Sequence, residues 1–211
     1  MFLQAALLVL FFVGSTLTIR DDDYPQAKYI ILRDLMATLL LGFSFLITFL
    51  CKNGLGVVGL TMLLTALAVQ LNIFTEPLMS FIIHAPPSEV GFPLPINIPA
   101  ATLLISYGAM IGRASLVQLT IMTLLQSFFY ALNKVLMVAG WWEAEDLGST
   151  LTIHMVGAYF GLAVSCVMGP LSSTAKASLS AISDVLCLLG TSVLWVCWPS
   201  FGRCHQKQPT R

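Results

Sequence analysis

Long apolar runs separated by short polar segments dominate this chain. Seven of the runs approach or exceed the roughly 20 residues that a helix needs to cross the hydrocarbon core of a bilayer. We place the predicted spans at residues 2–19, 35–51, 55–74, 96–111, 116–138, 149–168 and 179–198. The pattern therefore predicts an all-α fold, a polytopic transmembrane helix bundle of about seven spans.

The first run has two interpretations. Residues 2–19 stand where a signal peptide would, with Gly14 and Ser15 as the small residues before a cleavage site. A signal peptide, however, has a basic segment ahead of a shorter apolar region of roughly 7–15 residues. Because no basic residue precedes this run, we favour a retained first helix.

The polar segments predict how the spans are connected. Asp34 stands where its carboxylate would accept hydrogen bonds from the free N–H groups that open the second span. The short segment 52–54 predicts a tight antiparallel hairpin, and Gly56 and Gly59 after it predict close helix packing. Five prolines in residues 75–95 predict the longest loop, because proline interrupts helices.

Charged residues are scarce, which excludes several classes of function. They make up 9% of the chain and hydrophobic residues 57%, whereas roughly a quarter of the residues in a soluble domain are charged. The formal net charge is zero, so no basic face for nucleic acid is expected. The five cysteines have neither disulfide-framework nor metal-ligand spacing, and no nucleophile or carboxylate pair suggests an enzyme or a cofactor site.

The distribution of charge between alternate loops predicts the orientation. Lys52, Arg113 and Lys176 fall on one side, which the positive-inside rule assigns to the cytoplasm. The acidic loop residues fall on the other side; they are Asp21, Asp22, Asp23, Glu76, Glu89, Glu143, Glu145 and Asp146. We therefore expect a cytoplasmic N-terminus and an acidic outer mouth, with the basic tail as an exception to the rule.

The main candidate site is the segment that begins at Glu145. Its acidic start leads into an apolar run in which His154 has no charged neighbour, and such side chains in a membrane span usually mark a pore or a bundle interior. Asp146 lies eight residues earlier, roughly 12 Å along a helix, near the membrane surface. Structural roles are the alternatives, Asp146 as a helix cap and His154 as a link between helices. Gly157 and Gly161 form a small-xxx-small pattern that predicts tight helix packing.

Several motifs occur in a fixed order along the chain. Residues 146–162 read Asp-Leu-Gly-Ser-Thr-Leu-Thr-Ile-His-Met-Val-Gly-Ala-Tyr-Phe-Gly-Leu, and further motifs stand at 33–35, 42–46, 67–70, 108–113, 118–122 and 194–201. Together they resemble the Rh branch of the ammonium transporter family, with 146–162 similar to its fifth core helix. The resemblance covers residues 3–201 and implies the first half, plus one helix, of the ammonium transporter fold.

The resemblance implies roles for four positions. Asp146 matches an acidic residue of the external vestibule, and His154 matches the first of two histidines that line a narrow apolar pore. Phe201 matches one of two phenylalanines that stack above the pore as an outer gate. Ile98 stands where the second gate phenylalanine is expected, which leaves the gate incomplete.

A second departure from the family concerns length. The family builds its pore from two inverted halves, and the second pore histidine belongs to the half into which this chain does not extend. We therefore expect an incomplete transmembrane domain at residues 1–201 with a short basic tail at 202–211, and a splice product, a truncated gene model and a fragment are the alternatives. Alone, such a chain is expected to conduct poorly, because His154 would face lipid or a partner.

The functional interpretation has three alternatives. The first is a channel for ammonium or ammonia, with carbon dioxide as a second candidate substrate. The second is a non-transporting Rh blood-group-type subunit, multi-pass in the plasma membrane, that forms homo- or hetero-trimers with full-length Rh relatives. A seven-helix receptor is the third, which the short loops oppose. The absence of a glycosylation sequon and the presence of Ile98 favour the blood-group type, whereas Asp146 and His154 favour the transporters.

Overall fold

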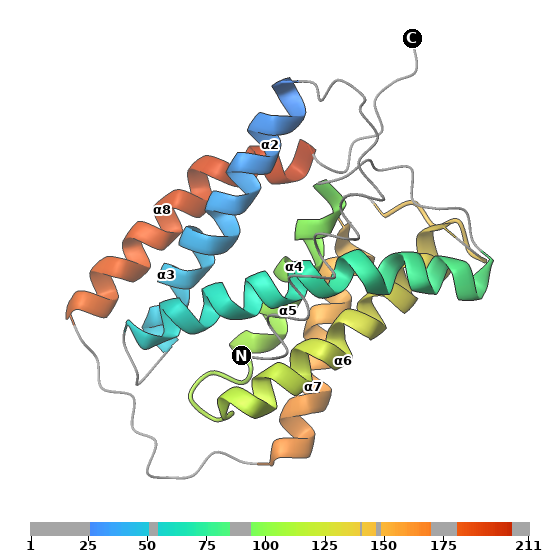
Figure 1. Ribbon diagram of the computed structural model, residues 1–211. Helices are drawn as coiled ribbons and strands as arrows, with labels where there is room; N and C mark the ends of the chain where they lie inside the picture. The colour runs from blue at the N-terminus through green and yellow to red at the C-terminus, as the bar shows by residue number, and fades with distance from the viewer. Residues whose placement is uncertain are drawn as a thin grey trace.

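The computed structural model describes residues 26–50, 55–84, 94–139, 141–146, 149–169 and 181–203. Within these ranges the chain is helical apart from short turns, and it contains no strand (Figure 1). The all-α prediction is therefore confirmed. The first predicted span, at residues 2–19, lies outside the described residues.

Residues 26–50 form one helical stretch that contains the predicted second span. It consists of α2 (Gln26–Ala37), the π-helical turn η1 (Thr38–Phe43), α3 (Ser44–Ile47) and the 3-10 turn η2 (Thr48–Leu50). Asp34 lies inside α2 and not at a helix start, so its predicted role as a cap is wrong. The helix starts earlier because residues 29–32 are apolar or aromatic and extend the apolar run ahead of Asp34.

Three helices form the centre of the molecule. They are α4 (Gly56–Ile83), α5 (Leu94–Gly108) and α6 (Leu116–Lys134), the last extended by the π-helical turn η3 (Val135–Ala139). Val57 and Leu119 line one cavity near the starts of α4 and α6, and an ion pair joins Glu76 to Lys134 near their ends. The two helices are therefore parallel, and α5 runs back between their ends in contact with both.

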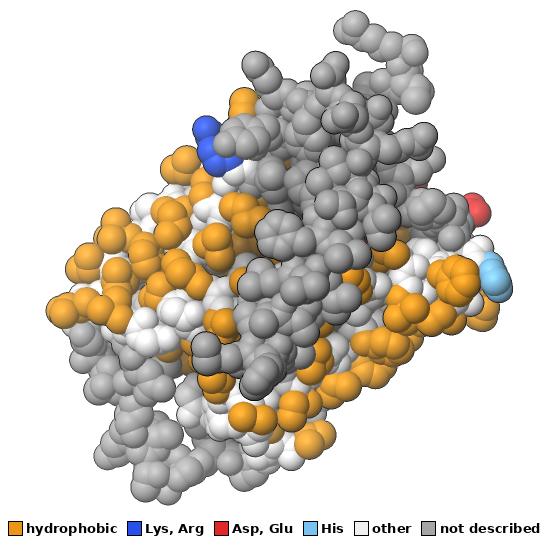
Figure 2. Space-filling model, in the orientation of Figure 1, with side chains coloured by type: hydrophobic (Ala, Val, Ile, Leu, Met, Phe, Trp, Pro, Cys, Tyr) orange, Lys and Arg blue, Asp and Glu red, His pale blue; other side chains and the backbone are white. Residues whose placement is uncertain are grey.

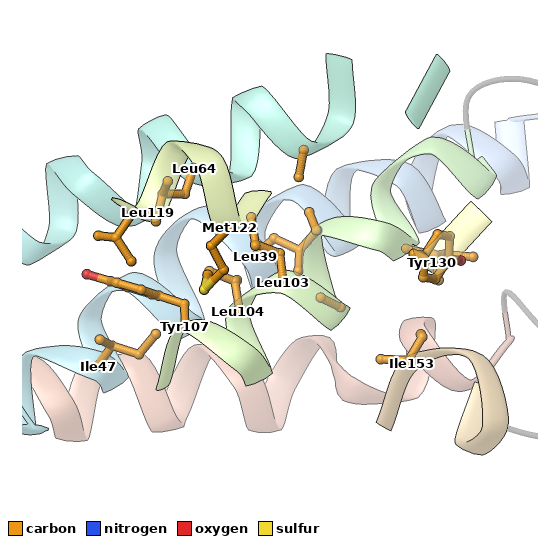
Figure 3. Close-up of a cluster of buried hydrophobic side chains, with 14 of the residues drawn as sticks. Leu39, Ile47, Leu64, Leu103, Leu104, Tyr107, Leu119, Met122, Tyr130 and Ile153 are labelled. Atoms are coloured by element: carbon orange, nitrogen blue, oxygen red, sulfur yellow. The ribbon is translucent and has the colours of Figure 1, made fainter. Parts of the chain in front are cut away.

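The core lies where these helices meet α2, η1 and the segment after residue 149 (Figure 3). Its buried side chains come from every one of these elements and include Leu39, Leu64, Leu103, Leu104, Tyr107, Met122 and Ile153. In a lipid environment the tails of the lipids are as apolar as leucine, so close packing rather than exclusion of water favours helix association.

The sixth and seventh predicted spans both form helices. The sixth consists of the π-helical turn η5 (Thr150–Met155) and α7 (Val156–Met168), and the seventh is α8 (Ala181–Arg203). α8 packs along residues 26–50 (Figure 1). At their crossing a Cβ on Gly190 would lie 2.6 Å from the backbone oxygen of Gly42, so only glycine permits this approach.

Within the described part of the chain, four helices are long and apolar enough to cross a membrane, namely 56–83, 116–138, 150–168 and 181–200, and α5 adds a shorter apolar helix. Among the side chains that are coloured by type in Figure 2, hydrophobic ones predominate, and the few charged ones lie at the margins of the view. On α8 the exposed apolar side chains include Ile182, Leu188, Trp195 and Val196. These features are those of a multi-pass membrane protein.

Two predictions about the third span are wrong. α4 does not end at Phe74 but continues through Pro77 to Ile83, so part of the predicted loop 75–95 is helical. A proline inside a helix removes one hydrogen bond, and neighbouring helices in membrane proteins compensate for that loss. Gly56 and Gly59 do not mark a close approach between described helices, since a Cβ at either position would meet no atom of the described residues within 4 Å.

Candidate functional site

The carboxylate of Asp146 caps the start of η5. Its Oδ1 accepts a hydrogen bond from the backbone N–H of Leu151 (2.9 Å), and its Oδ2 accepts from the N–H (3.0 Å) and the hydroxyl (2.7 Å) of Thr152. Ser149 precedes the helix in the left-handed backbone region, at φ 53°. A negative charge at a helix N-terminus is favourable, because the helix dipole is positive there. Asp146 is thus fixed in place and remains partly exposed.

His154 lies in η5, two residues after Thr152, and its side chain is exposed. Its Nδ1 is 3.4 Å from the backbone oxygen of Ser149. A carbonyl oxygen only accepts hydrogen bonds, so this contact suits the tautomer with its proton on Nδ1, in which Nε2 is an acceptor. The imidazole therefore lies on an outer face of α7 and η5, where the exposed residues Ala158 and Leu162 continue the same face.

The two candidate gate positions have different surroundings. Ile98 is buried in the core, with 8% of its surface exposed, and belongs to α5. Phe201 belongs to α8, but its side chain lies outside the described part of the structure. Of the four candidate pore residues, the structure thus brings Asp146 and His154 together on one short segment.

The acidic mouth is an exposed turn folded back onto η3. The N–H of Trp142 donates to the backbone oxygen of Leu136 (3.4 Å), and the N–H of Ala144 donates to that of Met137 (2.7 Å). The indole side chains of Trp141 and Trp142 are 79% and 69% exposed, and Glu143 and Glu145 are exposed beside them. Four exposed aromatic or acidic side chains therefore precede Asp146 in this turn.

Tight packing against α5 sets the position of α7. A Cβ on Gly157 would lie 2.8 Å from the backbone oxygen of Thr102, and one on Gly161 would lie 2.9 Å from the Cα of Ser106. Ser106 donates from its hydroxyl to the backbone oxygen of Gly157 (2.7 Å) and receives a hydrogen bond from the side chain of Gln126 (2.8 Å). This buried polar junction connects α5, α6 and α7 next to η5.

A buried ion pair joins α4 to α6 at the same end of the molecule. Nζ of Lys134 is 2.6 Å from Oε1 of Glu76, and both side chains are nearly buried. Asn72 donates to the other carboxylate oxygen of Glu76 at 3.2 Å. The pair therefore neutralises both charges inside the helix bundle.

The opposite end of α7 carries a different set of contacts. Arg113, in the turn between α5 and α6, donates to the hydroxyl of Ser165 (2.9 Å) and to the backbone oxygen of Gly169. Beside this turn lies a cavity of about 350 Å³, lined in part by Val57, Tyr107 and Leu119. The cavity is thus remote from the Asp146 segment.

Comparison with known proteins decides the family of this chain. The model of the Ammonium Transporter Family matches residues 1–209. The chain belongs to the ammonium transporter family. The Rh branch, predicted from the motifs, is confirmed by its relatives.

Relatives of this ammonium transporter family chain include the ammonium transporter Rh type A of Canis lupus familiaris, 36% identical over 85% of the chain and 44% of the relative. Ammonium transporter Rh type B of Bos taurus is 36% identical over 86% of the chain and 40% of the relative. Ammonium transporter Rh type C of Sus scrofa is 34% identical over 90% of the chain and 42% of the relative. The chain thus spans less than half the length of these relatives.

A solved structure of Nitrosomonas europaea Rh50, described as a member of the Rhesus protein family of channels, matches the fold with a TM-score of 0.70. The two sequences are 30% identical, and the match covers 84% of this chain and 48% of Rh50. The helix arrangement described above is therefore that of the ammonium transporter family, over one part of the larger fold.

Sequence reasoning about this ammonium transporter family chain missed the ion pair between Glu76 and Lys134. Glu76 was assigned to an external loop, and Lys134 was not singled out within its span. The available signal was a lone acidic and a lone basic residue in two apolar runs, since unpaired charges in such runs are costly. Their pairing across 58 positions depends on the tertiary structure.

Proposed function

We propose that this chain lines part of a channel for ammonium and ammonia, with Asp146 at its mouth and His154 inside. The observation that carries the proposal is the geometry of η5. One short segment presents a carboxylate that Thr152 holds in place and, two residues after that threonine, an exposed imidazole.

The chemistry of the two positions differs in a way that suits this substrate. Asp146, with Glu143 and Glu145, would attract ammonium by charge, and Trp141 and Trp142 offer cation–π contacts. An apolar conduit makes the charged ion costly, so ammonium would release a proton to water at the mouth and NH₃ would then pass. Nε2 of His154 can accept a hydrogen bond from NH₃ there. Carbon dioxide, which is also small and uncharged, is a second candidate for the same path.

The exposure of His154 argues that polypeptide beyond the described residues completes the conduit. Only 22% of the span 150–168 and 6% of the span 181–200 are buried within the chain. We propose that a full-length Rh relative covers this face, in a trimer at the plasma membrane with the acidic mouth outside.

A second candidate function is supported by the same exposure. A chain whose pore histidine faces outward could serve as a non-transporting subunit of the Rh blood-group type. In that case Gly157 and Gly161 matter for folding, and His154 has no role in transport.

Uptake of labelled methylammonium separates the two functions. Cells expressing a full-length Rh relative would be compared with cells that also express this chain, either unchanged or as His154→Ala at a matched surface level. We expect the unchanged chain to add uptake above that of the relative, and His154→Ala to abolish the added uptake. If both forms add the same uptake, His154 has no role in transport. If neither form adds uptake although it co-purifies with the relative, the chain is a non-transporting subunit.

Orientation needs its own measurement. We would insert an epitope between Glu143 and Glu145 and stain intact cells with an antibody that cannot cross the membrane. Antibody staining of unpermeabilised cells is expected, because the proposed mouth faces outward. Staining only after permeabilisation would contradict the proposed orientation.

A further inference from the structure

The ion pair between Glu76 and Lys134 is a nearly buried pair of charges that the proposed pore does not use. Their side chains are 10% and 14% exposed, and the contact is 2.6 Å long. Removing two charges from water is costly, and a well-packed apolar pair is often as stable. Such a pair is therefore better explained by what it holds in place than by the stability it contributes.

The pair lies at the base of the turn that carries Asp146. Lys134 is the last residue of α6, and η3 follows it directly. Two backbone hydrogen bonds, at 3.4 and 2.7 Å, fold residues 141–146 back onto η3. The carboxylate of Asp146 then holds the start of η5. A continuous set of contacts thus leads from the buried ion pair to the mouth.

Tyr130 is a further buried polar side chain near the ion pair. It is 1% exposed and lies one helical turn before Lys134 on α6. Its hydroxyl has no hydrogen-bond partner among the described residues. A buried polar side chain therefore lies one helical turn from the ion pair, on the helix that leads into η3.

We propose that Glu76 and Lys134 are positioning residues for Asp146. Their ion pair fixes the end of α6 against α4, which fixes η3 and the turn 141–146 and so keeps the carboxylate at the start of η5. The proposal deepens the proposed function, because it rests on that function for the capture of ammonium by Asp146. The positioning itself is a property of the fold and can be tested without transport.

The first test measures how firmly the turn is held. Glu143 and Glu145 stand in the exposed turn, so a glutamate-specific protease should cut the purified full chain there when the turn opens. In the double variant Glu76→Gln/Lys134→Met no buried charge is left unpaired, and the helices should stay folded. We expect cleavage after Glu143 or Glu145 to become about tenfold faster, because the population of the open turn limits cleavage.

A reversed pair and a surface pair are the controls. The charge-reversed variant Glu76→Lys/Lys134→Glu restores an ion pair, so its cleavage rate should return to that of the wild type. Arg33→Gln removes the exposed ion pair with Asp34 on α2 and should leave the rate unchanged. Two results would overturn the proposal. One is a double variant that keeps its helix content and is cleaved at the wild-type rate; the other is a charge-reversed variant that is cleaved faster than the wild type.

The second test links the pair to transport. In the co-expression assay the double variant should raise the apparent KM of the added methylammonium uptake several-fold and leave the maximal rate unchanged, because the capture site and not the conduit is disturbed. A fall in maximal rate with unchanged KM would contradict positioning of the mouth. If the unchanged chain adds no uptake, the proposed function fails, whereas the protease result still decides the positioning.

Discussion

The hydroxyl of Ser200 donates a hydrogen bond of 2.6 Å to Oδ2 of Asp34, across 166 positions of the chain. The two residues belong to two of the motifs that identify the family, one on α2 and one on α8. Arg33 contacts the other carboxylate oxygen at 3.1 Å. The contact therefore fastens the end of α8 to a helix from the start of the described chain.

Ser200→Ala should loosen the contact between α8 and α2. The hydrogen bond from Ser200 is the main cause that lowers the pKa of Asp34, which lies just before the predicted span 35–51. A lowered pKa means that this contact stabilises the fold above the ordinary pKa of 3.8 and that the stabilisation is lost as the pH falls through the lower folded value. Thermal unfolding in detergent at neutral pH should show a loss of about 1 kcal/mol.

The matched experiment compares the stability of Ser200→Ala and the wild type again, at a pH below the lowered pKa of Asp34. There Asp34 is protonated in both proteins, so the difference between Ser200→Ala and the wild type should shrink. A difference that grows on acidification would contradict the assignment.

Gly157→Ala should destabilise the packing of α7 on α5. The added Cβ would meet the backbone oxygen of Thr102 at 2.8 Å and the Cβ of Ile105 at 3.0 Å, and backbone cannot move aside as a flexible side chain does. Overpacking of this kind costs about 1–3 kcal/mol. Gly59→Ala is the control, since its Cβ would meet nothing within 4 Å and alanine favours the helix. Equal melting temperatures for the two variants would refute the close approach.

Two substitutions of Asp146 separate its structural role from its charge. Asp146→Ala removes the acceptors for Leu151 and Thr152 and should cost about 1 kcal/mol of stability, as is usual for a lost helix cap. Asp146→Asn keeps an acceptor and should cost less, while the charge at the mouth is lost. Melting temperatures give the first comparison. In the uptake assay both variants should raise the KM for methylammonium, and an unchanged KM in Asp146→Asn would mean that the carboxylate only caps the helix.

Lys134→Met should lower the free energy of unfolding more than the double substitution that removes both charges of the ion pair. The single substitution leaves the carboxylate of Glu76 buried without its cation, which costs about 3–5 kcal/mol in comparable cases. The double variant Glu76→Gln/Lys134→Met avoids that cost. Chemical denaturation of the two proteins in the same detergent measures the difference, and a double variant less stable than Lys134→Met would contradict it.

Much of the helix pattern could be predicted because each span is encoded locally. The predicted spans 116–138 and 149–168 differ from the structure by one residue at most. Pro77 shows where local reasoning fails, because the proline favours a loop and only the packing of Glu76 and Met79 against α6 explains a continued helix. The partner of Asp34 could not be predicted from spacing either, since Ser200 belongs to a distant helix.

The candidate site could be predicted in part. Asp146 and His154 were found from a charge and an imidazole at the start of an apolar run, and the family pattern supplied their roles. The hydrogen bonds that hold Asp146, and the exposed face on which His154 lies, depend on the turn before η5 and on the packing of α7. Neither is encoded in residue spacing.

The length of α4 has a consequence for the membrane around it. Its 28 residues extend for about 42 Å, against a hydrocarbon core of about 30 Å. Tilt alone would have to reach about 44° to hide the excess, beyond the usual 0–40° range of membrane helices. Part of the helix should therefore reach the lipid headgroups, and the excess of about 12 Å equals the stretch from Glu76 to Ile83. A thicker bilayer would draw this stretch inward, so the thickness of the host membrane should bear directly on the ion pair and on the mouth above it.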